Sequence, residues 1–479
     1  MLRILRWIGL AFLVLLAVIA FNTIRFTPPA STAIATDVPK NDGRIISEKL
    51  ARAIQFKTIS HPQNTPGRSL DFERFMDWIG TAFPNALGAM DRDIINGFTP
   101  IYKWAGSDPA AGAVLISGHY DVVPIEGEWS RDPWAGEISE GFVWGRGALD
   151  MKGGLMSVLE AADLLAAQGF QPKSDVYFAL THDEEIGGDF GSQGVVDYLR
   201  DNNIAIDWSL DEGSFVLRDI ISSIDADIAS INIAEKGYMT VRITAHDEGG
   251  HSSLPQRQTA VTKLAEVLVA LQNEPVAGGL TGVTRDFFDR LGRHMGLAER
   301  VLFANAWLFK PVIEGVLSGA NTTDAMLRSS TAPTMLEASD TENVLSQAAS
   351  AVVNFRLHPR DTPDDILAHI QDQIESDDIS VEVLRATPAS PVSDHENRAF
   401  TRLAEASQAV FGDVAIVPGL TIGGTDSAKY SQYVGDSYRF LPFVFTSDDL
   451  ALMHGKDERV SIENLARAVE FYQLVLGDL

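Results

Sequence analysis

Three short apolar segments, each ending in a polar loop that contains glycine, constrain the fold of this chain most. They are residues 113–117, 176–180 and 206–210. Between the first two, apolar residues recur every three or four positions from Gly154 to Gly169, which is the spacing of one helix face. Strand, helix and strand in this order predict a sheet with helices on its faces. Ligands of such sheets bind at the carboxyl ends of the strands.

The pattern changes after residue 236. Residues 238–244 alternate between apolar and polar side chains like a half-exposed strand, and residues 348–357 and 379–384 look similar. The last segment returns to glycine-rich loops and ends in a helix that Ser461 would cap. We therefore expect an α/β fold with a smaller α/β domain inserted into a larger one. The expected boundaries are residues 43–235 and 388–479 for the larger domain and 236–387 for the insert.

The amino-terminal segment is not predicted to be part of this fold. Arg3 and Arg6 precede an apolar run from Trp7 to Phe21. Fifteen helical residues span about 22 Å, but residues 4–24 would cross a hydrocarbon core of about 30 Å if Arg6 snorkels to the headgroups. A buried core helix is disfavoured, because nothing polar marks a solvent face.

We favour an uncleaved signal anchor over residues 1–29, followed by a tether over residues 30–42. A signal peptide cleaved after Ala20, or less readily after Ala35, stays open. Because arginines precede the run, the remainder is expected on the exported side in either case, anchored or released to the periplasm or medium. Membrane contact is expected through this segment only.

Composition excludes several classes of partner and site. The chain has 65 Asp and Glu against 38 Lys and Arg, a net charge of -27, which argues against a nucleic-acid partner. It has no cysteine, so any metal must be held by His, Asp and Glu side chains.

Two polar residues follow the first predicted strand. Residues two apart on a strand point to the same face, so Asp121 can reach the imidazole of His119 and fix which nitrogen faces a metal. An ordinary hydrogen-bonded pair at a strand end is the alternative.

Two further motifs place carboxylates next to glycine turns. Asp150 lies in a glycine-dense turn before the predicted helix, where it could bridge two cations or cap the helix. Glu184 and Glu185 follow the second strand, and adjacent buried carboxylates raise one another's pKa unless a cation neutralises them. If a metal binds Glu185, Glu184 is free to act as a general base. A solvated acidic loop is the alternative.

Asp211, after the third strand, and His454, before the last helix, complete a set of two imidazoles and three carboxylates. Such a set is enough for two metal ions that share Asp150. Nitrogen and oxygen ligands without sulfur favour zinc, with Co²⁺ or Mn²⁺ also compatible.

The order of these motifs resembles the dinuclear zinc metallopeptidase and amidohydrolase family that includes aminoacylase, acetylornithine deacetylase, succinyl-diaminopimelate desuccinylase and carboxypeptidase S. The resemblance covers residues 45–479. It is strongest to the branch of carboxypeptidase S and the N-fatty-acyl amino acid hydrolases, in four motifs: Gly-His119-Tyr-Asp121-Val-Val-Pro, His182-Asp-Glu184-Glu185, Tyr438-Arg-Phe-Leu-Pro442 and His454-Gly.

The resemblance implies a zinc-peptidase catalytic domain, a mixed sheet between helices, with the insert as its lid. It implies that His119 and Asp211 bind one zinc, Glu185 and His454 the other, and that Asp150 bridges them. Asp121 would orient His119, and Glu184 would move the proton.

The resemblance also implies roles for residues that bind the substrate, several of them in the lid. His251 would stabilise the oxyanion, and Asn343 and Arg356 would hold the substrate carboxylate. Gly424 and Thr425 would face the substrate, and a homodimer through the lids is compatible with the family.

The expected function is hydrolysis of an amide whose amine side is an amino acid with a free carboxylate, in a short peptide or an N-acyl amino acid. A membrane-tethered, metal-containing binding protein without turnover is the alternative. A two-metal phosphatase or nuclease is disfavoured by the acidic charge. An aromatic group in residues 286–317 would line an acyl pocket or, more commonly, belong to the core: Phe287, Phe288, Phe303, Trp307 and Phe309.

Overall fold

The computed structural model describes residues 2–29, 38, 40–61, 70–221 and 223–479. Most of the predicted tether and the second candidate cleavage site, Ala33-Ile-Ala35, lie outside these residues. Among the described residues a large mixed sheet has ten strands. Its order is β1 (Asp91–Ile95), β2 (Thr99–Trp104), β6 (Asp175–Thr181), β3 (Ala113–His119), β7 (Trp208–Asp211), β17 (Asp436–Arg439), β9 (Ile228–Glu235), β8 (Val216–Leu217) and β18 (Val444–Phe445), with β16 (Ala415–Thr421) paired to β9.

Both faces of this sheet are covered, as expected from strands that are apolar throughout. On β3, Val114 and Ile116 pack into a core with helices α2 (Arg44–Ile54), α5 (Lys152–Ala167) and α15 (Ile462–Gly477). The alternate residues Ala113 and Leu115 pack against α6 (Ser192–Asp201) and α14 (Ser427–Tyr430) on the other face. The predicted strands and helix of this region are confirmed, and the Ser461 side chain caps α15 by accepting a hydrogen bond from the amide of Asn464.

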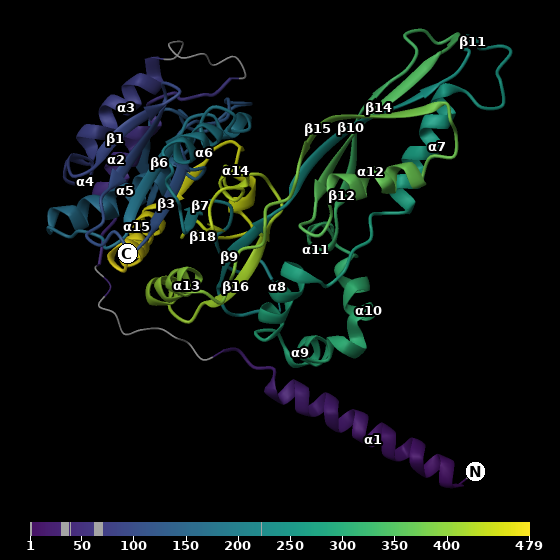
Figure 1. The fold of residues 1–479 in the computed structure, drawn as a ribbon, viewed down its shortest axis with the longest axis horizontal. Helices are drawn as coiled ribbons and strands as arrows, with labels where there is room; N and C mark the ends of the chain where they lie inside the picture. The colour runs from purple at the N-terminus through teal and green to yellow at the C-terminus, as the bar shows by residue number, and fades with distance from the viewer. Residues whose placement is uncertain (1, 30–37, 39, 62–69, 222) are drawn as a thin grey trace.

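A second, antiparallel sheet, called the small sheet here, contains the three strands predicted after residue 236 and one strand that was not predicted, β12 (Ser330–Glu337). Its order is β12, β14 (Ala348–Leu357), β10 (Gly237–His246) and β15 (Ile379–Thr387). Alternate residues of β10, among them Val241 and Ile243, pack against α7 (Ala260–Asn273) and α12 (Pro363–Asp372). Only Lys236 separates the end of β9 from the start of β10, so the two sheets are directly joined (Figure 1).

Four helices within the predicted insert pack elsewhere. They are α8 (Gly282–Gly292), α9 (Leu297–Ala304), α10 (Ala306–Leu317) and α11 (Asn321–Leu327). Phe287 and Phe288 of α8 are buried with Ala415 and Val417 of β16, a strand of the large sheet. The aromatic segment therefore forms core rather than an acyl pocket. Phe303 and Phe309 pack against this core, whereas Trp307 is exposed.

The amino-terminal segment forms one helix, α1 (Leu2–Arg25), which projects from the body (Figure 1). Residues Arg3–Arg25 are long and apolar enough to cross a membrane, and their central window is not buried inside the protein. The helix is therefore not a core helix. Its carboxyl end contacts α9.

Candidate active site and metal centre

Parallel pairing brings the predicted site residues to one edge of the large sheet. β3 lies between β6 and β7 and pairs in parallel with both, so His119, Thr181 and Asp211 end neighbouring strands at the same edge. Asp150 comes from the turn before α5, and its peptide bond to Met151 is cis. Residue 151, not Asp150, is the amino-terminal cap of α5.

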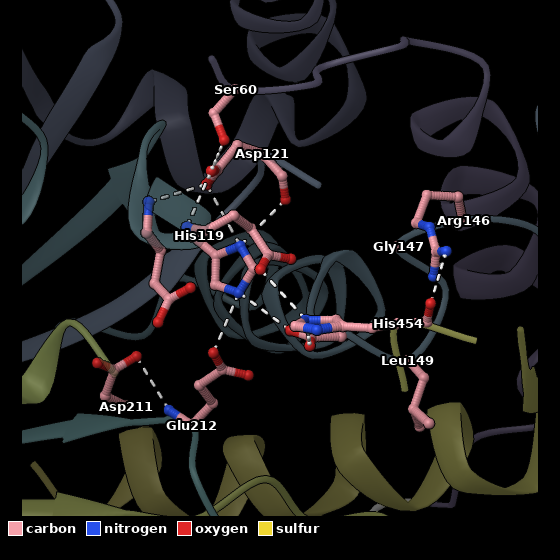
Figure 2. Close-up of polar contacts among 12 residues, drawn as sticks. Ser60, His119, Asp121, Arg146, Gly147, Leu149, Asp211, Glu212 and His454 are labelled. Atoms are coloured by element: carbon pink, nitrogen blue, oxygen red, sulfur yellow. Dashed lines mark hydrogen bonds and ion pairs between the residues drawn. The ribbon is translucent and has the colours of Figure 1, made fainter. Parts of the chain in front are cut away.

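The carboxylate of Asp150 lies between the imidazoles of His119 and His454, two side chains that Figure 2 labels. Its Oδ1 atom is 3.1 Å from Nε2 of His119, and its Oδ2 atom is 3.1 Å from Nε2 of His454. The same His454 nitrogen is 3.2 Å from Oε2 of Glu185. Ligand atoms of His119, Asp150 and Glu185 all lie within 4.8 Å of one another.

The third strand places Glu212, not the predicted Asp211, beside His119. Oε1 of Glu212 is 3.0 Å from Nε2 of His119. The Asp211 carboxylate instead accepts hydrogen bonds from the amide of Glu212 at 2.9 Å and from Oγ of Ser427 at 3.1 Å. His119, Glu184 and Glu212 form a second compact group of ligand atoms.

Asp121 is fully buried behind His119. Its carboxylate lies 3.4 Å from Nδ1 of His119, and its backbone carbonyl lies 3.0 Å from the same nitrogen. The carboxylate also accepts hydrogen bonds from Oγ of Ser60 at 2.6 Å and from the amides of Glu184 and Glu185 at 3.2 Å each. One side chain thus fixes the His119 ring and the backbone of both glutamates.

Burial and mutual repulsion raise the pKa values of two carboxyl groups of this site. Burial raises the pKa of Glu184 well above its usual value, and the neighbouring carboxylates of Glu212 and Asp426 add to the shift. Burial and the charge of Asp150 raise the pKa of Glu212 to about 8. Strongly shifted carboxyl groups in a cleft are characteristic of catalytic centres.

These residues fit a divalent metal. Oε1 of Glu185 is buried and has no hydrogen-bond partner among the residues that the structure describes. Hydrogen bonds to Asp150 and Glu185 raise the pKa of His454 to about 10, so the site favours a positive charge there. Imidazole and carboxylate donors without sulfur match zinc and related ions.

Two residues without a predicted role hold the turn that carries Asp150. Glu458 is completely buried and accepts hydrogen bonds from the amides of Gly147, Leu149 and Asp150. It also pairs with Arg146 at 2.7 Å, and Arg146 donates to the backbone carbonyl of His454 at 3.1 Å (Figure 2). Glu458 lies only four residues after His454, and that proximity was the available signal in the sequence.

A cavity of about 350 Å³ adjoins the acids and His454. Arg356 of β14 lines it with its guanidinium 4.9 Å from the ring centre of Tyr238. Gly424 and Thr425 line it as well, and Oγ1 of Thr425 donates to Glu235 at 2.7 Å. The structure therefore brings these three predicted substrate residues together with Glu184, Glu185 and His454.

His251 and Asn343 are not among the residues that line this cavity. His251 belongs to β11 (Gly250–His251), which pairs with β13 (Val344–Leu345) directly after Asn343. This short ribbon lies at the end of the small sheet that points away from the large sheet (Figure 1). In the described part of one chain, the predicted pair of Asn343 and Arg356 is therefore not assembled.

Comparisons with known proteins agree with this geometry. The pattern of peptidase family M20/M25/M40 matches residues 115–478. The chain is 34% identical to a probable carboxypeptidase S-like 2 of Dictyostelium discoideum and 30% identical to the N-fatty-acyl-amino acid synthase/hydrolase PM20D1 of Xenopus tropicalis, in each case over 96% of this chain and 91% of the relative.

Among solved structures, the fold is similar to an M20 family metallo-carboxypeptidase, Sso-CP2 from Sulfolobus solfataricus. The TM-score is 0.62 at 18% identity, and the match covers 90% of this chain and 98% of that one. Human carnosine dipeptidase 1 matches with a TM-score of 0.58 at 16% identity, over 91% and 96% of the two chains. The chain therefore belongs to peptidase family M20/M25/M40 and is a hydrolase of that family.

Proposed function

We propose that this hydrolase cleaves the amide bond of a short peptide or an N-acyl amino acid whose amine side carries a free carboxylate. The observation that carries the proposal is the single cavity shared by Glu184, His454 and the guanidinium of Arg356. Guanidinium offers two parallel donors that match a carboxylate. The names of both relatives, a carboxypeptidase and an N-fatty-acyl-amino acid hydrolase, describe substrates of this class.

Two zinc ions would complete the site. His119 and Glu212 would hold one ion, Glu185 and His454 would hold the other, and Asp150 would be shared by both. Asp211, which holds the amide of Glu212, would position that ligand. When bound, the ions would polarise the scissile carbonyl and make a water molecule more acidic.

The chain's own groups would then carry the proton and the substrate. Glu184 accepts a proton from the attacking water and delivers it to the leaving nitrogen, and its raised pKa suits this exchange. Asp121 keeps the His119 ring in place. Arg356 binds the substrate carboxylate and sets the reacting carbonyl beside Glu184.

A second copy of the chain would supply His251 and Asn343. Both lie at the short ribbon of β11 and β13, where a neighbouring chain could receive them. Neither residue lines the cavity of its own chain. The proposed unit is therefore a homodimer paired through the small sheets. The helix α1 would anchor each chain, with the catalytic body on the exported side of the membrane.

The test is a substrate panel on the zinc-loaded full chain. It varies acyl length and amino acid, and includes each substrate with its carboxylate amidated. We expect hydrolysis of the free acids and little of the amidated forms. Glu184→Gln should abolish turnover without loss of zinc, whereas Glu48→Gln, on the exposed face of α2, should leave turnover unchanged. Wild-type protein that binds zinc but cleaves no member of the panel would indicate a binding protein instead.

A further inference from the structure

The helix α10 presents a broad apolar side to the solvent. Seven of its residues are exposed; one is Lys310, and the other six are apolar residues, glycine and proline: Trp307, Leu308, Pro311, Val312, Gly315 and Val316. They form two adjacent rows, each with a spacing of four, and so cover one side of the helix. Trp307 is 61% and Val316 is 70% exposed, whereas Ile313 on the opposite side is buried.

This arrangement differs from that of a surface helix in water, which exposes a polar side, because α10 is apolar on its buried side and on most of its exposed side. Its two charged residues, Lys310 and Glu314, pair with each other at 3.6 Å, and Lys310 is 47% exposed. Large apolar patches on a protein surface indicate a partner.

The amino-terminal helix contacts the residue that directly precedes α10. Asn305, at the junction of α9 and α10, is completely buried against α1. Its side chain exchanges hydrogen bonds with the side chain of Asn22 at 3.0 Å and of Thr23 at 3.3 Å, and with the carbonyl of Ile19 at 3.3 Å. Hydrogen-bonded polar side chains of this kind join helices inside membranes.

A second set of contacts fixes the end of α1. The guanidinium of Arg293 lies 4.5 Å from the ring centre of Phe26, which is buried, and it donates to the carbonyl of Thr27. Arg300 donates to the carbonyl of Thr23. The carboxyl-terminal end of α1 is therefore packed against the segment that contains Arg293 and Arg300.

These contacts determine the height of α10 relative to a membrane that α1 would cross. Ile19 lies six residues before Arg25, the end of the candidate span, so the contact reaches about 9 Å below that end. In Figure 1, α10 is joined to α9 at this level and is turned across the line of α1 rather than along it. A helix in this position lies in the plane of the membrane surface.

The charge of the region around α10 is compatible with contact between this region and a membrane. The chain carries a net charge of -27, but residues 282–327, which contain α8 to α11, hold five basic and five acidic side chains. This segment is therefore neutral in an otherwise acidic protein, and a bilayer with anionic lipids does not repel it.

We propose that α10 lies in the lipid interface of the exported leaflet, with Trp307, Val312 and Val316 in contact with the lipid. The partner is a phospholipid bilayer, and the chain thus rests on the membrane by two elements, α1 and α10. Amphipathic interfacial helices bury their apolar side about 5–10 Å into the headgroup and acyl boundary, and tryptophan favours that depth. The proposal rests on the membrane anchor proposed above.

Because the chain contains no cysteine, single cysteines can report on depth. Val312→Cys and Val316→Cys, each in the full chain, are labelled with an environment-sensitive fluorophore and reconstituted into phosphatidylcholine and phosphatidylglycerol vesicles. Leu10→Cys reports on α1. Ile94→Cys, a 48% exposed apolar position on β1 of the large sheet, is the matched control in water. Hydrolytic activity of each variant confirms its fold.

We expect spin-labelled lipids to quench the label at residues 312, 316 and 10, and a water-soluble quencher to act on the label at residue 94 alone. Quenching at residue 10 together with water access at both α10 positions would overturn the α10 proposal and leave the anchor intact. Loss of lipid contact at residue 10 would overturn the anchor itself. Protection of the label from both quenchers at residues 312 and 316, together with disulfide-linked dimers of the same variants before labelling, would identify a second copy of the chain as the occupant and would also overturn the proposal.

Discussion

Oε1 of Glu212 lies 3.0 Å from Nε2 of His119, although its neighbour Asp211 ends the strand of the large sheet. The two carboxylates are adjacent in the sequence but have different partners. Glu212 faces the imidazole, whereas Asp211 accepts hydrogen bonds from Ser427 and from the amide of Glu212. They should therefore contribute differently to metal binding.

We expect Glu212→Gln to lower the metal content from two ions per chain toward one, because a charged ligand is lost. Asp211→Asn should retain both ions with an affinity reduced about 10- to 100-fold, the usual effect of a residue that orients a ligand. Elemental analysis after dialysis and titration with zinc measure both quantities. If Asp211→Asn instead lost more metal than Glu212→Gln, Asp211 would be the ligand, as the sequence predicted.

Glu458 is the buried counterion of Arg146 and holds three amides of the turn before Asp150. Glu458→Ala leaves the buried guanidinium uncompensated and should lower the free energy of unfolding by about 3–5 kcal/mol. The double variant Arg146→Met with Glu458→Leu should be less destabilised, because no unpaired charge remains. Denaturant unfolding of the wild type and the two variants provides the comparison, and a double variant that is at least as destabilised as Glu458→Ala would argue against the pair.

Arg356 should govern recognition of the substrate carboxylate. Arg356→Met removes charged hydrogen bonds worth about 1.5–3 kcal/mol each, so kcat/KM for free-acid substrates should fall by about one to two orders of magnitude. The loss should be much smaller for amidated substrates. Arg242→Met on β10 is the matched control, since Arg242 pairs with Glu382 on the same sheet and does not line the cavity. Equal losses on both substrate forms would show that Arg356 has only a structural role.

His358 should make the protein sensitive to acid. Its Nδ1 atom accepts from the amide of Arg360, so Nε2 carries the hydrogen and donates to Oγ1 of Thr284 on α8. Burial, together with the charges of Arg360 and Lys236, lowers the pKa of His358 to about 3. The buried imidazole is therefore neutral in the folded protein.

The direction of the pH effect on stability follows from proton uptake by the unfolded chain. Below the unfolded pKa of about 6.5 the unfolded chain binds a proton that the folded chain does not, so stability falls as the pH drops from 6.5 toward 3. The slope is at most about 1.4 kcal/mol per pH unit for this group. His358→Gln should be less stable at pH 7 but should lose less stability between pH 6.5 and 4. Denaturant unfolding at several pH values tests this, and parallel curves for the two proteins would contradict it.

Local sequence patterns were sufficient for much of the fold. Short apolar runs predicted β3, β6 and β7, and the periods of their own side chains predicted α5 and three strands of the small sheet, β10, β14 and β15. The fourth strand of that sheet, β12, was not predicted. The cap at Ser461 needs only a hydroxyl three residues before a free amide. The His119, Asp150, Glu185 and His454 motifs were recognisable because each stands at the end of a predicted element.

Tertiary structure decided the rest. Periodicity located the end of β7 but could not tell whether the carboxylate of Asp211 or that of Glu212 lies beside the His119 imidazole, since adjacent strand residues point in opposite directions. Asn343 and Arg356 are thirteen positions apart, yet the nine strand residues from Ala348 to Arg356 alone extend over about 26 Å and separate them. The packing of α8 on β16 and of α9 on α1 joins segments more than one hundred, and more than two hundred and fifty, positions apart in the sequence. Such contacts depend on which surfaces meet when the chain closes, and no local period of the sequence encodes that.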